Sequence, residues 1–225
     1  MRVIRGRAGN VDADHDRTGA MVQRAVETGE PALRVWTPHR QVAFGRRDAR
    51  TEGYDSARAA ADRGGYPPVE RDVGGRAVAF TGSTLAVVHA DPGANRTAIQ
   101  SRYEAATARY RRAFDSLGVD VRRGEPDASF CPGIHSLQAT GKLAGLAQRV
   151  RRDVAVTAGV VVVRDDAAIA DVLAPVYDAL DVPFDPETVD SVAAAGGPSD
   201  PEAVADAIVD AYGGDDAAVE RLRET

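Results

Sequence analysis

Two side chains with reactive potential stand eleven residues apart in the chain. Cys131 is the single cysteine and lies in the segment Phe130-Cys131-Pro132-Gly133, and Lys142 is the single lysine among 28 basic residues. A thiolate is a nucleophile that a nearby ammonium stabilises, and a fixed cation also stabilises the charge that develops on a carbonyl oxygen during acyl transfer. The pair therefore indicates acyl-transfer chemistry at Cys131 and Lys142. A buried structural cysteine and an ordinary surface lysine are the alternatives.

Small residues surround Lys142. Gly141 precedes it, and Gly145 and Ala147 follow it in a run of small residues. Because small side chains let a ligand lie close to the backbone, we expect Gly145 and Ala147 to bind substrate beside the ammonium.

The loop that begins at Arg71 is a second candidate binding segment. Gly74 and Gly75 would let backbone N–H groups approach an acyl chain or a phosphate, and Arg71 would supply charge at the mouth of the site. We expect Arg76 and Ala77, which follow, to contact the substrate as well. A Gly-Gly pair between a loop and a strand is also the ordinary composition of a turn.

The four histidines give no metal pattern. His15, His39 and His89 are scattered without the spacing of metal ligands, so no metal is predicted. His135 follows Cys131 by four residues, which on a strand returns it to the same face. It is a candidate general base, with a core or solvent-exposed histidine as the alternative.

The elements that would position these residues mix strands and helices without regular alternation. Apolar runs predict strands over 3–7, 32–36, 41–44, 76–80, 84–89, 135–138, 142–146 and 154–163. Helical periodicity and stop signals predict helices over 14–28, 54–63 and 96–117. The fold class is therefore α+β, with a mixed, largely antiparallel central sheet flanked by helices.

Local signals add detail to this outline. The four residues between strands 32–36 and 41–44 are typical of a hairpin. Beyond Arg164 short helices follow, and Pro175 is expected to interrupt one of them. Asp185-Pro186 and Asp200-Pro201 predict helix starts, with Asp as cap and Pro in the first turn. We expect residues 1–165 to form the catalytic core and 166–225 a helical extension of the same domain.

Composition narrows the function classes. The 225 residues suffice for one α/β domain, and a net charge of −6 argues against a nucleic-acid backbone as the main partner. A single cysteine excludes an internal disulfide. The sequence contains neither a long apolar stretch nor a signal-like N-terminus, so we expect a cytoplasmic protein without a membrane partner.

Four segments, taken in order, resemble a known superfamily. They are residues 33–45, the loop from Arg71 to Val78, Cys131-Pro132-Gly133, and the run Gly141-Lys142-Leu143-Ala144-Gly145-Leu146-Ala147-Gln148-Arg149. The chain resembles the biotin/lipoate protein ligase and octanoyltransferase superfamily, in its lipoate-protein ligase A family. The pattern is most similar to that of the lipoyl-domain octanoyl amidotransferases. The resemblance implies the biotin/lipoate ligase catalytic-domain fold.

The resemblance also implies an activity. It is the transfer or attachment of a lipoyl or octanoyl group to a lysine of a lipoyl carrier domain, through a thioester on Cys131 and without a cofactor. The carriers implied are the glycine-cleavage H-type protein and the E2 chain of 2-oxoacid dehydrogenases. The chain departs from the family pattern at Val73, where Ser is usual, and at Arg76, where ATP-using ligases have a third Gly.

Two other activities stay open at this point. One is an ATP- and Mg²⁺-dependent lipoate-protein or biotin-protein ligase, with a small separate accessory subunit as a possible partner. The other is a non-catalytic subunit that binds acyl carriers. The loss of the third Gly at Arg76 favours transfer over adenylation, and retention of both Cys131 and Lys142 argues against mere binding.

Overall fold

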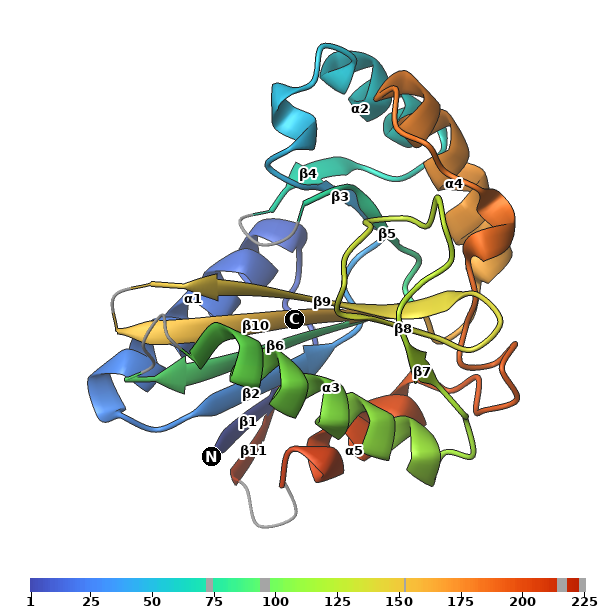
Figure 1. Cartoon of the computed structure of the whole chain (residues 1–225). Helices are drawn as coiled ribbons and strands as arrows, with labels where there is room; N and C mark the ends of the chain where they lie inside the picture. The colour runs from blue at the N-terminus through green and yellow to red at the C-terminus, as the bar shows by residue number, and fades with distance from the viewer. Residues whose placement is uncertain (72–74, 94–97, 152, 214–217, 223–225) are drawn as a thin grey trace.

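The computed structural model describes residues 1–71, 75–93, 98–151, 153–213 and 218–222. Its main element is an eight-stranded sheet in the order β11-β1-β2-β6-β10-β9-β8-β7 (Figure 1). These strands are β1 (Arg2–Arg5), β2 (Ala32–Trp36), β6 (Leu85–Pro92), β7 (Arg122–Arg123), β8 (Ser136–Gln138), β9 (Lys142–Val150), β10 (Val154–Val161) and β11 (Ala218–Arg221).

The sheet is mixed and largely antiparallel, as predicted. β1 runs parallel to β11 and β2. Every other pairing, from β2 with β6 to β7 with β8, is antiparallel. A second sheet of three strands, β4 (Pro68–Glu70), β3 (Gln41–Phe44) and β5 (Val78–Phe80), was not predicted.

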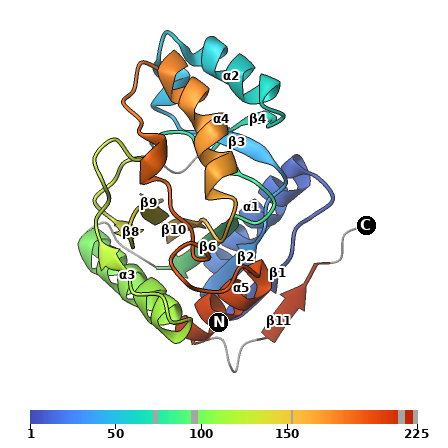
Figure 2. The same cartoon turned by 90° about the vertical axis from the view of Figure 1, so that its right-hand side faces the viewer.

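Helices cover both faces of the large sheet. α1 (Val11–Thr28) packs on β6 and β10 from one side, while α3 (Ile99–Ser116) and α5 (Pro201–Ala211) lie together on the other side. α2 (Tyr54–Arg63) and α4 (Asp166–Ala179) pack against each other and against the small sheet. Figure 2 shows these two helices side by side above the large sheet. Among the described residues, 3₁₀ turns lie at Asp48–Arg50 and Pro186–Thr188.

Alternation along the strands explains the two apolar layers. On β6, Leu85 and Val87 point to the α3 and α5 face, while Val88 and Ala90 point to the α1 face. The approach of α3 depends on Gly159 of β10, because a Cβ there would lie 2.0 Å from the Tyr110 hydroxyl. The sheet therefore separates two apolar layers, and the cavity described below lies on the side of α1.

The predicted helix starts are confirmed. Asp200 caps α5 by accepting the N–H of Glu202, with Pro in the first turn. Asp185 caps its 3₁₀ turn in the same way. At the N-terminus α1 begins three residues earlier than predicted, because Asn10 accepts the N–H of Ala13 and forms the cap.

Two local predictions are wrong. β2 and β3 do not form a hairpin, because β2 pairs with β1 and β6 whereas β3 pairs with β4 and β5 in the other sheet. The short link carries the chain from one sheet to the other. α4 also continues through Pro175, since the burial of Leu173, Val176 and Tyr177 around it outweighs the lost backbone hydrogen bond.

The segment 166–225 contributes more than helices. β11 pairs with β1 at the edge of the large sheet, which was not predicted. α4 joins α2, and α5 joins α3. The division of the chain at residue 165 stays a prediction. Within the described residues, no helix is both long enough and apolar enough to cross a membrane.

Candidate active site

The loop that carries Cys131 is held in an unusual backbone conformation. Cys131 has a φ of +41°, in the left-handed region that side chains other than glycine rarely adopt. Its N–H donates to the hydroxyl of Tyr177, and that hydroxyl donates to the carbonyl of Ala77 at 3.0 Å. Tyr177 is completely buried on α4. One hydroxyl therefore links the loop that carries Cys131 to Ala77, which immediately precedes β5.

Lys142 lies under the same loop at the start of β9. Its side chain is 1% exposed, and Nζ donates to Glu125 Oε2 at 2.7 Å, to the Phe130 carbonyl at 2.8 Å and to the Cys131 carbonyl at 2.7 Å. All three N–H groups of the ammonium therefore have protein partners. Two of these partners are backbone carbonyls, so the ammonium holds the backbone of the loop that carries Cys131.

Glu125 accepts hydrogen bonds from other residues of this loop. Its Oε1 accepts the N–H of Gly133 at 2.6 Å, and its Oε2 accepts the Ser136 hydroxyl at 2.7 Å as well as the Lys142 ammonium. A buried ammonium needs such a carboxylate, because an unpaired charge at this depth would be strongly destabilising. Glu125 is therefore the counter-ion of Lys142.

The glycines around Lys142 leave room for close neighbours, and substrate binding by Gly145 and Ala147 stays a prediction. A Cβ on Gly141 would lie 2.6 Å from the Thr188 carbonyl, and Asp190 Oδ2 accepts the Gly141 N–H at 2.9 Å. A Cβ on Gly145 would lie 3.4 Å from Lys142 Cε, so this glycine leaves room for the lysine stem. Ala147 pairs with Ala158 within the sheet.

Arg71 is the predicted residue that touches the thiol. Its Nη2 lies 3.2 Å from Cys131 Sγ and donates to the Arg76 carbonyl at 2.6 Å. Burial raises the pKa of the Cys131 thiol, but Arg71, Lys142 and the backbone N–H groups of Arg76 and Gly75 outweigh it, so the pKa is lowered. The site therefore stabilises the thiolate relative to that of an ordinary cysteine.

Arg76 is directed at a buried acid. Its Nη1 lies 3.1 Å from Asp48 Oδ1, and Asp48 Oδ2 accepts the N–H of Gly45 at 3.0 Å. Burial raises the pKa of Asp48, against the opposing effect of these partners. A Cβ on Gly45 would lie 2.5 Å from the Gly75 carbonyl, so the two glycine backbones are in contact. Gly74 lies outside the described residues, and its predicted role is not placed.

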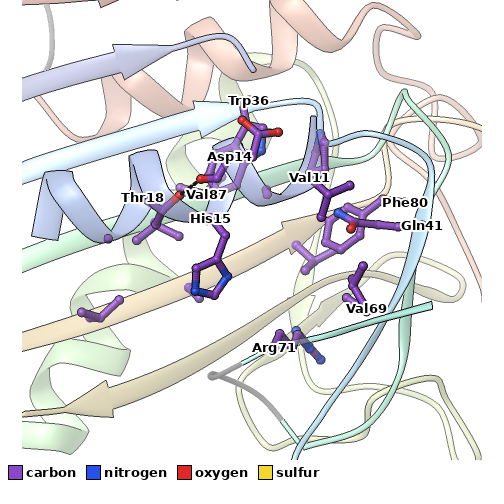
Figure 3. Close-up of a pocket in the computed structure, with 18 of the residues that line it drawn as sticks. Val11, Asp14, His15, Thr18, Trp36, Gln41, Val69, Arg71, Phe80 and Val87 are labelled. Atoms are coloured by element: carbon purple, nitrogen blue, oxygen red, sulfur yellow. Dashed lines mark hydrogen bonds between the residues drawn. The ribbon is translucent and has the colours of Figure 1, made fainter. Parts of the chain in front are cut away.

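A cavity of about 490 Å³ opens between α1, the large sheet and the small sheet (Figure 3). Most of its lining is apolar, including Val11, Val22, Trp36, Val69, Phe80, Val87, Val156 and Val160. Neither Cys131 nor Lys142 is part of the lining, but Arg71 is. Since Arg71 also touches Sγ, this side chain forms the boundary between the cavity and the thiol.

His135 is held by neighbours other than Cys131. Its ring stacks on Tyr103 at 3.6 Å between centroids, and Nδ1 lies 3.0 Å from Arg123 Nη2. Burial first, and then the charge of Arg123, lowers its pKa. Its role as a base stays a prediction. In the part of the chain that the structure describes, no cluster of three or more His, Cys, Asp or Glu side chains could hold a metal ion.

Sequence reasoning missed three residues that shape this site: Glu125, Tyr177 and Asp48. Each acts through a contact with a segment far away in the sequence or through a backbone group. No motif marks them, so only the folded structure identifies them.

The fold is that of solved lipoate-protein ligase structures. The structure aligns with a crystal structure of lipoate-protein ligase A bound with ATP at a TM-score of 0.72 and 18% identity, over 99% of this chain and 89% of that one. It also aligns with the bi-partite lipoate protein ligase of Thermoplasma acidophilum, at a TM-score of 0.69 and 16% identity over 99% and 87% of the two chains. The predicted fold is confirmed.

The family follows from the sequence match. Residues 18–213 match the lipoyl protein ligase A/B catalytic domain, and the chain belongs to this family. It is 37% identical to an octanoyl-[GcvH]:protein N-octanoyltransferase of Exiguobacterium sibiricum, over 59% of this chain and 49% of that protein. It is 30% identical to a lipoyl-[GcvH]:protein N-lipoyltransferase of Listeria monocytogenes, over 52% and 43%. The chain thus spans about half the length of the curated relatives it matches.

Proposed function

We propose that this protein transfers an octanoyl or lipoyl group to a lysine of a lipoyl carrier domain through a thioester on Cys131. The observation that carries the proposal is the contact between Arg71 and the Cys131 thiol, because Arg71 also lines the apolar cavity and the buried Lys142 holds the Cys131 carbonyl. The names of the two transferase relatives support the same chemistry. The single lysine of the chain is thus placed under the single cysteine.

In the first step the thiolate attacks the acyl carbonyl carbon of the donor. The new bond is Sγ–C, and the bond from the carbonyl carbon to the donor nitrogen breaks, with the departing amine taking up a proton. The carbonyl oxygen gains negative charge on the way. Arg71 is the side chain placed to stabilise that oxygen, because it lies at the boundary of the cavity and the thiol.

In the second step the neutral amine of the acceptor lysine attacks the thioester. A C–N bond forms, the C–Sγ bond breaks and the amine loses a proton. The groups that lower the thiol pKa, Arg71 and Lys142 among them, also make the thiolate a good leaving group. The same electrostatics therefore serve both steps.

The cavity suits a medium-length chain. Val156, Ala158 and Val160 alternate along β10 and line it, so this wall extends over four residue steps of about 3.3 Å, roughly 13 Å. An extended chain of eight carbons fits within that length. Burial of its methylenes would contribute about 0.8 kcal/mol each.

We propose H-type and E2 lipoyl domains as the carriers, and the names of the two relatives, which include GcvH, support the first of them. The ligase alternative would place an adenylate phosphate against the glycine loop. Arg76, whose guanidinium pairs with Asp48, occupies the position of a third glycine there. We propose on this ground that transfer needs neither ATP nor Mg²⁺. Asp72, Val73 and Gly74 lie outside the described residues.

The test is intact-mass spectrometry of the purified chain with an octanoylated or lipoylated H-type carrier, with and without ATP. We expect a covalent acyl adduct that hydroxylamine removes, formed equally in both arms, and its transfer to an E2 lipoyl domain. Modification of that domain from free lipoate only when ATP is present would overturn the proposal and identify a ligase. A Cys131→Ser chain with full turnover would exclude the thioester.

A further inference from the structure

The backbone of Arg76 is the point at which the groups around the thiol meet. Its N–H and that of Gly75 donate hydrogen bonds to the Cys131 thiol. Its carbonyl accepts from Arg71 Nη2 at 2.6 Å, and the same Nη2 lies 3.2 Å from Sγ. Two backbone N–H groups and one guanidinium therefore converge on the sulfur, and all three are connected to the backbone of residues 75 and 76.

Successive backbone N–H groups that point at one atom form a concave anion-binding site. Such a site stabilises a thiolate only while the N–H groups stay directed at the sulfur, because a hydrogen bond weakens steeply when its angle is lost. A glycine backbone is conformationally permissive, so Gly75 does not fix this direction by itself. The orientation of the two N–H groups has to be fixed by contacts from another part of the chain.

Asp48, in the turn that follows β3, makes these contacts. The residue is 0% exposed, Oδ1 lies 3.1 Å from Arg76 Nη1, and Oδ2 accepts the N–H of Gly45 at 3.0 Å. A Cβ on Gly45 would lie 2.5 Å from the Gly75 carbonyl carbon and 2.9 Å from the Arg76 nitrogen. The carboxylate thus holds the side chain of Arg76 and also the backbone against which the Gly75–Arg76 peptide packs.

Stability alone does not account for this buried ion pair. Taking two charges out of water is costly, and replacing a buried pair by apolar side chains is often neutral or stabilising. What apolar side chains could not do is hold two donors in fixed directions on one carboxylate. The consequence of the pair is therefore the geometry of the backbone that it holds.

We infer that Asp48 is a positioning residue for the nucleophile: its carboxylate keeps the N–H groups of residues 75 and 76 directed at the Cys131 thiolate. This inference rests on the proposed function, since it treats Cys131 as the nucleophile of the transfer. Asp48 acts through Arg76 and Gly45, so its removal should change the thiol without removing a group that contacts the sulfur.

The direction of one pH shift distinguishes positioning from simple electrostatics. By Coulomb's law, loss of the negative charge of Asp48 would lower the pKa of a nearby thiol or leave it unchanged. Loss of the hydrogen bonds that Asp48 positions would raise the pKa of Cys131. Arg71, Lys142 and Tyr177 also face the thiol, and they are present in either case. The two explanations therefore predict opposite signs.

The experiment measures the rate of Cys131 alkylation by iodoacetamide against pH in Asp48→Asn. Sγ bonds to the reagent's carbon and iodide leaves, and the single cysteine makes the signal specific. Asparagine has one acceptor oxygen in place of two, so it can accept only one of the donors from Arg76 and Gly45. We expect the midpoint to move to higher pH. The rate at neutral pH should fall about tenfold, the effect of one lost hydrogen bond to a charged group.

Substitutions at the other end of the pair test the same connection. Arg76→Lys keeps a charged donor for Asp48 and should leave the midpoint close to that of the wild type. Arg76→Gln should move it to higher pH, and the double variant with Asp48→Asn should shift it no further than the larger single change. Because Arg76 is 24% exposed, Arg76→Gln also carries the test if Asp48→Asn does not fold.

Asp14→Asn is the matched control. Asp14 is also a buried carboxylate that accepts from one guanidinium, that of Arg34, and from one backbone N–H, that of Ala8. Its substitution removes a pair of the same kind from the other side of the molecule. We expect a lower free energy of unfolding in urea, with an unchanged midpoint for alkylation of Cys131.

The outcomes separate this inference from the proposed function. A midpoint that moves to lower pH in Asp48→Asn, or does not move, would overturn the positioning role even if the chain still forms an acyl adduct. An equal shift in Asp14→Asn would also overturn it, because the shift would then come from a general loss of stability. If the expected shifts appear but the wild-type chain takes no acyl group from the carrier, the proposed function fails and the positioning of the thiolate stands.

Discussion

Two buried cations lie in different parts of the molecule, Lys142 under the cysteine loop and Arg34 beside α1. Both side chains are almost completely buried, at 1% and 0% exposure, and each is paired with one carboxylate, Glu125 or Asp14. Each also accumulates main-chain carbonyl partners and lies over an aromatic ring, at 4.9 Å and 4.1 Å. The two sites solve the same problem of keeping a charge out of water.

What differs is the backbone that each cation holds. Arg34 donates to the carbonyls of Asp14 and Gly6, and so joins α1 and the end of β1 to β2. Lys142 donates to the carbonyl of Cys131, whose left-handed backbone needs support. The same kind of interaction therefore holds α1 and β1 on β2 in one case and the backbone of Cys131 in the other. Substitutions should separate these two roles.

Cys131→Ser should give the largest effect, a loss of acyl transfer of at least ~10³-fold, because an alcohol is far less ionised than a thiol. The free energy of unfolding in urea should change little. Transfer is measured by mass spectrometry of the acceptor domain. A large loss of stability would show that the residue is structural, as the alternative interpretation of the sequence had it.

Arg34→Met should lower the free energy of unfolding, because its role is structural. Removal of the guanidinium leaves the Asp14 carboxylate buried without its partner, which typically costs about 3–5 kcal/mol. Urea unfolding measures the change. The matched double variant Arg34→Met with Asp14→Leu should recover part of it. If Arg34→Met unfolds at the same urea concentration as the wild type, Arg34 does not have the structural role that distinguishes it from Lys142.

Lys142→Arg should reduce the turnover rate by about 10²-fold, the usual effect of losing one preorganised charged donor. A planar guanidinium cannot reproduce three bonds from one compact ammonium in the space that Gly145 leaves. The loss should be in kcat, with the KM for carrier little changed. Near-normal rates in both Lys142→Arg and Lys142→Ala would show that Lys142 takes no part in acyl transfer.

Tyr177→Phe should lower the rate of Cys131 alkylation by about tenfold, because one unpaired backbone group costs about 1–3 kcal/mol. The hydroxyl accepts the Cys131 N–H and donates to the Ala77 carbonyl, so both loops loosen. Tyr110→Phe is the control, since it removes another buried hydroxyl that has no partner. Equal alkylation rates in Tyr177→Phe and wild type would mean that the conformation of the cysteine loop does not depend on the Tyr177 hydroxyl.

Arg71→Gln should give the smallest effect, a shift in the pH dependence of alkylation. In the wild type the Cys131 pKa is lowered, so the thiolate forms below the pH of an ordinary thiol. Loss of the Arg71 charge raises the pKa, and the alkylation curve moves to higher pH. Iodoacetamide rates measured against pH give the midpoint. A shift to lower pH, or none, would contradict the assigned cause.

Local sequence patterns were sufficient to predict most of the helices and strands. The bounds of α2, β2 and β3 are those predicted, because periodicity and glycine stops are local properties. The pairing of β2 with β3 was wrong because spacing alone does not say which sheet a strand joins. The Lys142 environment could not be predicted either, since Glu125 is 17 residues away and carries no motif.

The hydrogen bonds from the C-terminal part of the chain have a consequence for synthesis on the ribosome. The cysteine loop depends on Tyr177, and the turn before Lys142 depends on Asp190. A nascent chain that has not yet reached these residues contains Cys131 but lacks the contacts that fix its loop. The loop that carries Cys131 thus reaches its final conformation late in synthesis, after the residues up to Asp190 have left the exit tunnel.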